Sequence, residues 1–227
     1  MSTVPNYKAT WNHLAETEHS ALIHVAGYTD EARLKESVDV TLRMLDMTIG
    51  IKPEDRFLEI GCGVGRVGQY LAPKVSHWTG CDVSENMLAH AARRLKNTPN
   101  ISLRAISGHD LSPIPDASVD AVYCTVVFMH LEEWDRFGYM KEAFRILKPG
   151  GRFMCDNANL ESKGGWELFQ ASASIPADER PKHISRCSTE AEFKTFLSKA
   201  GFQDVKLMLQ DLWVFGWGKK PLYKLSG

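Results

Sequence analysis

A glycine-rich segment in the first third of the chain is the part whose residue types could do chemistry. Residues 57–60 (Phe-Leu-Glu-Ile) form a short apolar run typical of a buried strand, and Gly61 begins a cluster of glycines that stops it. Helical spacing of apolar residues resumes at Val67 and ends before Pro73. A strand, a tight glycine turn and a helix in this order point backbone N–H groups and the positive helix end at a ligand above the turn. The segment therefore predicts a nucleotide-type binding loop.

Two glycine patterns overlap in this loop, and they predict different nucleotides. Read from Gly63, the sequence Gly-Val-Gly-Arg-Val-Gly fits the G-x-G-x-x-G fingerprint of dinucleotide-binding loops, and Asp82 lies 19 residues further on. Read from Gly61, the sequence Gly-Cys-Gly-Val-Gly fits G-x-G-x-G, with an acid, Glu59, two residues before it. We favour the second register because Gly61 follows the strand directly and Glu59 lies at its carboxyl end. A glycine-rich turn in an unrelated α/β protein is the remaining alternative.

Length and composition narrow the class of protein. A chain of 227 residues with 44% hydrophobic and 24% charged residues suits one α/β domain with a full core, alone or with a small appendage. The formal net charge is −1 without a basic block, which argues against nucleic acid as a partner. No basic and apolar leader is visible, and no apolar run approaches the ~20 residues of a membrane helix. We therefore expect a cytoplasmic protein that does not act at membranes.

Cysteine and histidine usage points to reduced thiols and no metal. The five cysteines are an odd number without C-x-x-C spacing, and none of the eight histidines pairs with a cysteine at ligand spacing. We expect the cysteines to pack as small apolar residues, three of them in or beside buried strands.

Hydrophobic spacing predicts alternating strands and helices over most of the chain. Helices are expected at 6–26 and 29–50, and strands at 57–60, 77–82, 101–106, 119–127 and 152–156, with helices between the strands. Strict alternation predicts a parallel sheet with right-handed crossovers. After it, residues 157–188 form a long polar segment, Thr189 opens a capped helix, and strands 202–209 and 212–217 form an antiparallel hairpin.

The first helix, residues 6–26, has two possible roles. Tyr7, Trp11 and His24 make it richer in aromatic and imidazole groups than a helix that only packs on a sheet requires. We therefore expect it to cover the mouth of the binding site as a lid, with Gly27 as its hinge. Packing alone is the alternative, and it is the expected role of the second helix.

Further segments follow the glycine loop in an order that resembles the class I S-adenosylmethionine-dependent methyltransferases. The Glu-x-Gly-x-Gly-x-Gly loop resembles motif I of this family, and Asp82 and Asp110 lie where the family places acids after strands two and three. Residues 118–122 (Ser-Val-Asp-Ala-Val) resemble its motif IV strand, and residues 145–151 (Arg-Ile-Leu-Lys-Pro-Gly-Gly) resemble its turn before strand five. The resemblance covers residues 51–217.

The resemblance implies a fold and a cofactor. The expected fold is α/β and Rossmann-like, a doubly wound and mostly parallel sheet with a C-terminal antiparallel hairpin and an N-terminal helical lid. The expected domains are a helical segment, residues 1–50, and a methyltransferase domain, residues 51–227, in which residues 157–188 form a cap or loop insertion. The implied cofactor is S-adenosyl-L-methionine.

The resemblance also implies roles for single residues. Asp82 would bind both ribose hydroxyls, Asp110 would accept a hydrogen bond from the adenine amino group, and Glu59 would face the methionine amino group through water. Simple capping or turn formation is the alternative for each acid. The implied cofactor-binding residues are Glu59, Gly61, Cys62, Gly63, Gly65, Asp82, Val83, Met87, His109, Asp110 and Thr125. The residues expected to contact the methyl acceptor are Tyr7, Trp11, Tyr28, His130 and Trp166.

The implied reaction is displacement at a sulfonium methyl group, with a nitrogen or oxygen atom of a small molecule as acceptor. Its neutral thioether leaving group makes positioning and water exclusion the main tasks of the protein. A hydroxyl acceptor would also need a base, and His130, ten residues past Asp120, is the candidate. A polar turn residue is the alternative role for His130. Two rival functions remain, an NAD-dependent oxidoreductase using the register from Gly63 and a non-catalytic protein that binds S-adenosylmethionine.

Overall fold

The computed structural model describes residues 6–222, so the ends of the predicted domains, residues 1–5 and 223–227, lie outside the described residues. The chain divides into two compact units. Residues 6–108 and 119–123 belong to the first unit, and residues 109–118 and 124–222 belong to the second.

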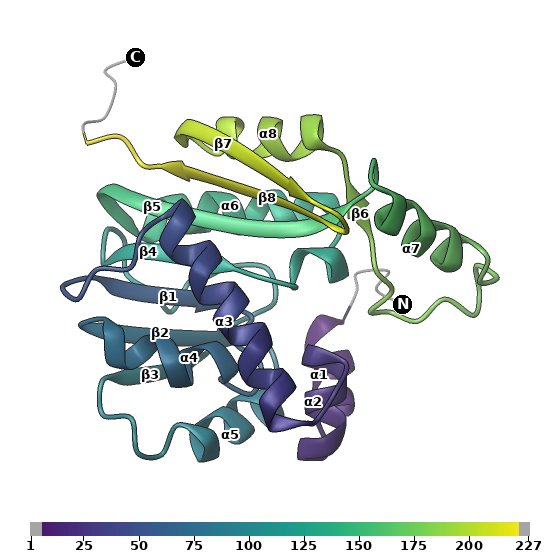
Figure 1. Ribbon diagram of the computed structural model, residues 1–227, viewed down its shortest axis with the longest axis horizontal. Coiled ribbons are helices and arrows are strands. Elements are labelled where there is room, and N and C mark those ends of the chain that lie inside the picture. Colours follow the sequence, from purple (N-terminus) through teal and green to yellow (C-terminus); the bar gives the residue numbers. More distant parts are fainter. Residues whose placement is uncertain (1–5, 223–227) are drawn as a thin grey trace. The chain divides into compact units, whose positions relative to one another are not determined.

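Strands of the first unit form the parallel part of the fold (Figure 1). They are β1 (Arg56–Ile60), β2 (His77–Asp82), β3 (Ile101–Ala105) and β4 (Val119–Cys124), in the order β3-β2-β1-β4. β1 pairs with β2 and β2 with β3 in parallel. β4 is shorter than the predicted strand 119–127, because the backbone leaves the extended conformation at Val126, where φ is +59°. The predicted parallel pairing is confirmed for β1, β2 and β3.

Two of the longer helices of the first unit begin at side-chain caps. The helices that follow residue 30 in this unit are α3 (Glu31–Thr48), α4 (Arg66–Leu71), η1 (Ala72–Lys74) and α5 (Glu85–Arg94). The Ser84 side chain accepts a hydrogen bond from the Met87 N–H and thereby caps α5. The Asp30 side chain caps α3 in the same way through the Arg33 N–H. Figure 1 shows α3 and α4 side by side.

The single helix predicted for residues 6–26 is wrong, because two helices occupy this segment. They are α1 (Tyr7–Leu14) and α2 (Glu18–Ala26). The Thr17 side chain accepts a hydrogen bond from the Ser20 N–H, which starts a second helix. The Ser20 hydroxyl in turn donates to the Leu14 carbonyl at 2.8 Å, which satisfies the end of α1. Two local caps therefore override the continuous apolar spacing.

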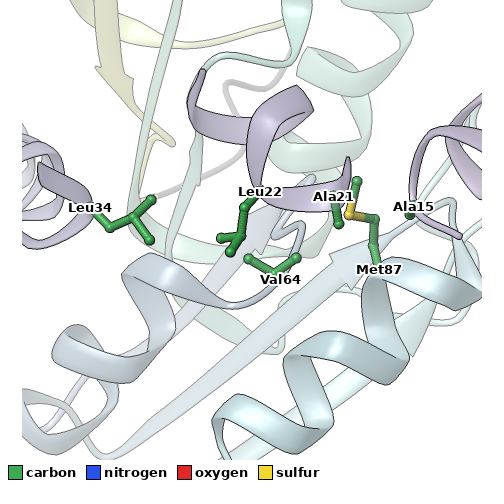
Figure 2. Packing of buried hydrophobic residues seen from close by; sticks show 6 residues of the cluster. All are labelled: Ala15, Ala21, Leu22, Leu34, Val64 and Met87. Carbon is green, nitrogen blue, oxygen red and sulfur yellow. The ribbon is translucent and has the colours of Figure 1, made fainter. Parts of the chain in front are cut away.

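α1 and α2 bury their apolar side chains on the glycine loop and on α5 (Figure 2). Leu22 of α2 points to Val64 of the loop, and Ala21 lies beside Met87 of α5. Leu34 of α3 joins the same cluster. Burial of these groups fastens the N-terminal segment to the first unit through the hydrophobic effect.

Strands of the second unit include the antiparallel part of the fold. They are β5 (Leu147–Asn159), β6 (Cys187–Ser188), β7 (Gln203–Gln210) and β8 (Trp213–Lys219), and the short β6 pairs with β5 in parallel. β8 pairs antiparallel with both β5 and β7, which confirms the predicted C-terminal hairpin. β5 is longer than the predicted strand 152–156, because β8 pairs with it over residues 152–158. The predicted turn at Lys148-Pro149-Gly150-Gly151 lies inside this strand.

Helices of the second unit are α6 (Glu133–Ile146), α7 (Lys163–Ala173) and α8 (Glu190–Lys199), preceded by the short helix η2 (Phe128–His130). Thr189 caps α8 through the Glu192 N–H, as predicted. The polar segment 157–188 contains the unpredicted helix α7, because the Ser162 side chain accepts from the Gly165 N–H and starts it. Trp134 near the start of α6 is exposed.

The parallel strands of the first unit and the antiparallel hairpin of the second confirm the mixed, Rossmann-like α/β fold. All five cysteines are free thiols, and four of them are buried. Of the helices in residues 6–222, none is both long and apolar enough to cross a membrane.

Gly68 and Gly138 offer a matched test of packing. A Cβ at Gly68 in α4 would lie 2.6 Å from the Trp78 ring, whereas the nearest atom to a Cβ at Gly138 in α6 is the His109 carbonyl oxygen at 3.7 Å. We expect Gly68→Ala to destabilise the protein by about 1–3 kcal/mol through overpacking. Gly138→Ala should stabilise it by up to about 1 kcal/mol through helix propensity. Denaturant unfolding measures both, and equal effects would contradict the packing of α4 on Trp78.

Candidate functional site

The glycine loop of the first unit adopts the geometry of the register read from Gly61. Gly61, Gly63 and Gly65 have φ values of +72°, +52° and +77°, in the left-handed region that favours glycine. Gly65 is the N-cap of α4, whereas Gly68 lies inside that helix. The alternating left-handed glycines therefore match G-x-G-x-G, and the glycine of the dinucleotide register at position 68 serves helix packing.

Asp82, at the carboxyl end of β2, holds the loop from the side. One carboxylate oxygen accepts from the Gly63 N–H at 2.8 Å, and the other accepts from the Ser84 N–H at 2.9 Å. The side chain is buried, and burial raises its pKa to about 6 although the N–H groups act to lower it. Asp82 thus joins the loop to the start of α5.

Glu59, at the end of β1, lies in a buried chain of hydrogen bonds. The indole N–H of Trp78 donates to the Tyr123 oxygen at 3.0 Å, and Tyr123 donates its hydroxyl hydrogen to Glu59 at 2.6 Å. The direction is set because an indole N–H can only donate. Burial raises the pKa of Glu59 to about 8. The structure thus places a phenol beside this acid.

Arg66, the first residue of α4, is a functional candidate that the sequence did not indicate. Its guanidinium donates to the Ser37 hydroxyl in α3 at 2.8 Å and to the Val25 carbonyl in α2 at 3.3 Å. Burial lowers its pKa, and the Glu59 carboxyl acts in the opposite direction. The only available signal was an arginine directly after the glycine motif. Arg66 therefore connects the glycine loop to α2 and α3.

Val25 of α2 covers the glycine loop directly. A Cβ at Gly63 would lie 3.0 Å from the Val25 Cγ1 atom. A side chain at position 63 would therefore displace α2 and strain the left-handed backbone.

The remaining predicted residues of the first unit lie in well-packed surroundings. Met87 belongs to the cluster of Figure 2, and Trp11 and Tyr28 pack against it. The Arg33 guanidinium lies 4.6 Å from the centre of the Tyr28 ring. Tyr7 and Cys62 are buried, and Val83 is half-buried. Met87, Trp11 and Tyr28 therefore contribute to the packing of the N-terminal segment on the first unit.

In the second unit, the predicted adenine acid lies in a tight turn. One oxygen of Asp110 accepts from the Ser112 N–H at 3.0 Å. The neighbouring His109 Nδ1 lies 3.3 Å from a carboxylate oxygen of Asp135 in α6. Thr125 is half-buried and follows β4 directly.

His130, the predicted base, is held by the backbone of another loop. Its Nδ1–H donates to the His183 carbonyl at 2.8 Å, which assigns the lone pair of the neutral ring to Nε2. Burial lowers the pKa of His130 to about 4. The ring is therefore expected to be neutral near pH 7.

Trp166 projects from α7 and stacks on Phe169, with ring centres 5.4 Å apart. Both rings are exposed.

A second feature that the sequence did not indicate involves Val126, which follows β4 and has a strained backbone. Its N–H donates to the buried carboxyl of Asp156 at 2.7 Å. Burial raises the pKa of Asp156 to about 7. Within residues 6–222, no group of three or more His, Cys, Asp or Glu side chains is placed to hold a metal ion.

The glycine loop, its flanking acids and the mixed sheet define a nucleotide-binding α/β protein, and comparison with known proteins narrows the class. Residues 58–155 match the family described as "Methyltransferase domain". A protein from Mycolicibacterium smegmatis, described as a probable S-adenosylmethionine-dependent methyltransferase, is 34% identical over 146 residues, which are 64% of this chain and 51% of that protein. The S-adenosyl-L-methionine-dependent Diels-Alderase iccD from Talaromyces variabilis is 27% identical over 202 residues, which are 81% of this chain and 66% of that protein. The chain thus spans between half and two thirds of the length of these relatives.

A solved structure extends the likeness to the whole fold. Magnesium protoporphyrin IX methyltransferase from Synechocystis, with bound S-adenosylhomocysteine, superposes with a TM-score of 0.69 at 16% identity, covering 94% of this chain and 97% of that one. This identity shows a common fold only. Residues 58–155 are thus similar to a methyltransferase domain, and the described fold is that of a solved methyltransferase with bound S-adenosylhomocysteine.

The acids of the first unit fit this cofactor. S-adenosylmethionine presents an ammonium group and two ribose hydroxyls, and each of these needs an acceptor. Glu59 and Asp82 supply two buried carboxyl groups at the ends of adjacent strands, and neither forms an ion pair within residues 6–222. A cationic ligand group would supply the counter-charge that a buried carboxylate requires.

The raised pKa of Glu59 predicts how stability depends on pH. The free side chain ionises near pH 4.5 and the folded one near pH 8, so the folded state binds more protons between these values. Stability then falls as pH rises through this window, by at most about 1.4 kcal/mol per pH unit. We expect Glu59→Gln to gain stability relative to the wild type from pH 5 to pH 8, measured by denaturant unfolding.

Glu142 provides the control of opposite sign. The hydrogen-bonded ion pair with Arg145 lowers the pKa of Glu142, so its contribution should be lost as pH falls. A pH-independent difference between Glu59→Gln and the wild type would contradict the buried, protonated state of Glu59.

Proposed function

We propose that this protein transfers the methyl group of S-adenosylmethionine to a nitrogen or oxygen atom of a small molecule. The observation that carries the proposal is the left-handed glycine loop bonded to the buried Asp82, in a chain whose residues 58–155 match a methyltransferase domain. When bound, the cofactor supplies an electrophilic methyl group on a sulfonium that leaves as a neutral thioether. The acceptor lone pair forms the new bond, the C–S electron pair stays on sulfur, and the acceptor proton passes to a base or solvent.

The residues of the first unit would bind and orient the cofactor. Asp82 accepts from the ribose hydroxyls, and Glu59 accepts from the methionine amino group. The left-handed loop offers backbone N–H groups without a Cβ in the way. The segment of α1 and α2 would exclude water as a cover, an assignment supported by the Val25 contact above Gly63. Tyr7, Trp11 and Tyr28 would bound the acceptor from this segment.

The residues of the second unit would serve adenine and the acceptor. Asp110 accepts from the adenine amino group, with His109 and Thr125 as neighbours of the cofactor. His130 would take the acceptor proton on Nε2, since its Nδ1–H is committed to the His183 carbonyl. The exposed Trp166 of α7 offers an aromatic face to the acceptor.

Cofactor binding should depend on Asp82. We expect Asp82→Ala to weaken the binding of S-adenosylhomocysteine by about 1–3 kcal/mol, because ligand hydroxyls and the Gly63 N–H lose their acceptor. Asp120→Ala is the control, since Asp120 also accepts from a backbone N–H, that of Arg56 at the start of β1. Titration calorimetry measures both variants. Unchanged affinity in Asp82→Ala would contradict the proposal, and NADH binding that responds to it would favour the oxidoreductase.

A second function deserves a test because of the relative from Talaromyces variabilis. That protein is named a Diels-Alderase that depends on S-adenosylmethionine, and its match covers 81% of this chain. A screen of acceptors that detects released S-adenosylhomocysteine separates the two functions. Release coupled to acceptor methylation supports methyl transfer. If the protein converts a small molecule only when the cofactor is present, and no S-adenosylhomocysteine is released, the methyl-transfer proposal would be overturned.

His130 should affect the rate more than cofactor affinity. If it is the base, His130→Ala should lower the methyl-transfer rate by roughly 10²–10⁴-fold. Because its pKa is about 4, the rate of the wild type should not change through titration of His130 between pH 6 and pH 8. It should fall only as pH drops towards 4, where the ring gains a proton.

His183→Ala is the matched control for this variant. It keeps the backbone carbonyl that accepts from the His130 Nδ1–H, so the rate should remain close to that of the wild type. Wild-type turnover of His130→Ala at saturating acceptor would remove His130 from the site.

A further inference from the structure

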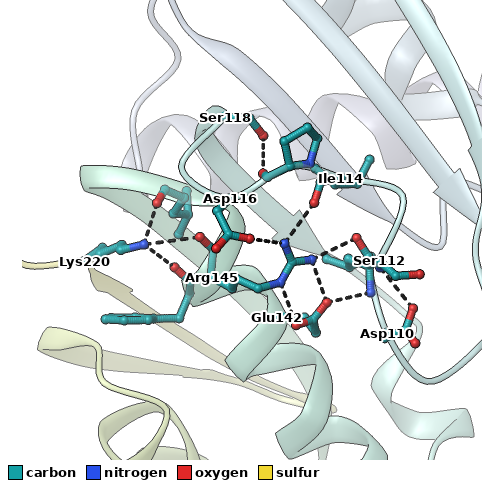
Figure 3. Close-up of polar contacts among 12 residues, drawn as sticks. Asp110, Ser112, Ile114, Asp116, Ser118, Glu142, Arg145 and Lys220 are labelled. Carbon is teal, nitrogen blue, oxygen red and sulfur yellow. Dashed lines mark hydrogen bonds and ion pairs between the residues drawn. The ribbon is translucent and has the colours of Figure 1, made fainter.

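Arg145, in the last turn of α6, uses every donor of its guanidinium group (Figure 3). Nε and Nη2 each donate to one carboxylate oxygen of Glu142 at 2.8 Å. Nη1 donates to the Ile114 carbonyl at 2.9 Å and to Asp116 at 2.5 Å, and Nη2 also donates to the Leu111 carbonyl at 3.0 Å. An arginine has five N–H donors in a fixed plane, so this geometry fixes the side chain completely.

Glu142 binds the same loop through its carboxylate. The Oε2 atom that accepts from Arg145 also accepts from the Leu111 N–H at 2.9 Å. The ion pair therefore holds both the N–H and the carbonyl of Leu111, and Leu111 itself is buried. These two bonds restrict the peptide planes on either side of Leu111.

Asp110 is the residue next to this fixed point. Its carboxylate accepts from the Ser112 N–H, so its turn begins before Leu111 and closes after it. A carboxylate in such a turn takes its direction from the peptide planes that form the turn. The Arg145–Glu142 pair thus restrains the peptide on which the turn of Asp110 is built.

The carbonyl groups at the end of α6 do not need the Arg145 side chain as a donor. Lys220 donates to the carbonyls of Phe144 and Leu147 at 2.7 Å each, and the Ser118 N–H donates to the Ile146 carbonyl. These groups satisfy carbonyls at the end of the helix. The N–H groups of the Arg145 side chain instead all donate to Glu142 and to the loop of residues 111–116.

We propose that Arg145 and Glu142 are positioning residues for recognition of the adenine ring, acting through Asp110. The proposal rests on the proposed function, in which Asp110 accepts from the adenine amino group. An amino group and a carbonyl differ in hydrogen-bond direction, so a fixed carboxylate discriminates between adenine and hypoxanthine. A loosened Asp110 loses this discrimination without losing the rest of the cofactor contacts.

The test compares the dissociation constants of S-adenosylhomocysteine and S-inosylhomocysteine, in which a carbonyl replaces the purine amino group. The wild type should bind the adenosyl compound roughly tenfold or more tightly, and Asp110→Ala should reduce this ratio to near one. Arg145→Lys keeps the charge but not the planar fork, and Glu142→Gln keeps the shape but not both acceptors. Each should lower the ratio at least threefold, and the Leu111 amide should exchange its hydrogen faster.

Lys220→Gln is the control, because it weakens the end of the same helix without touching the loop of residues 111–116. It should lower the melting temperature and keep the wild-type ratio. A wild-type ratio in folded Arg145→Lys and Glu142→Gln, with a reduced ratio in Asp110→Ala, would overturn the positioning role alone. A wild-type ratio in Asp110→Ala overturns both the adenine role of Asp110 and the positioning role. Absence of S-adenosylhomocysteine binding to the wild type overturns the proposed function itself.

Discussion

The constraint on which the first unit depends is the burial of two carboxyl groups at the ends of adjacent parallel strands. Glu59 ends β1 and Asp82 ends β2, and neither has a cationic side chain in contact within residues 6–222. Buried carboxyl groups must then be satisfied by N–H and O–H donors. The Gly63 and Ser84 N–H groups serve Asp82, and the Tyr123 hydroxyl serves Glu59. The loop conformation and the start of α5 follow from these bonds.

The helices α2 and α3 contact the same loop. Arg66 could neutralise Glu59, but its donors reach Ser37 and the Val25 carbonyl instead. Its charge therefore acts on Glu59 only at a distance, while its hydrogen bonds fasten α2 and α3 to the motif. Leu22 and Val25 add apolar contacts with the loop. The hydrogen bond from Arg66 and the apolar contacts of Leu22 and Val25 therefore hold α2 over the glycine loop.

The second unit shows how one helix can serve both the core and a site. The inner face of α6 buries Met140 and Ala143, while Glu142 and Arg145 in its last turns hold the loop that carries Asp110. The relatives show that a similar chain can carry different names, a methyltransferase in one case and a Diels-Alderase in another. Fold and cofactor loop therefore do not decide the reaction, which depends on the groups that meet the acceptor.

Local signals in the sequence determined β1, β2 and β3, the glycine register, the cap at Thr189 and the C-terminal hairpin, because each depends on neighbours a few residues apart. The break at Thr17 was missed because apolar spacing continues across it. The state of the acids was decided only by the tertiary structure. Tyr123 lies 64 residues from Glu59, and Leu111 lies 31 residues from Glu142. Contacts at such separations, and the loss of water that shifts the pKa values of Glu59 and His130, exist only once the chain has folded.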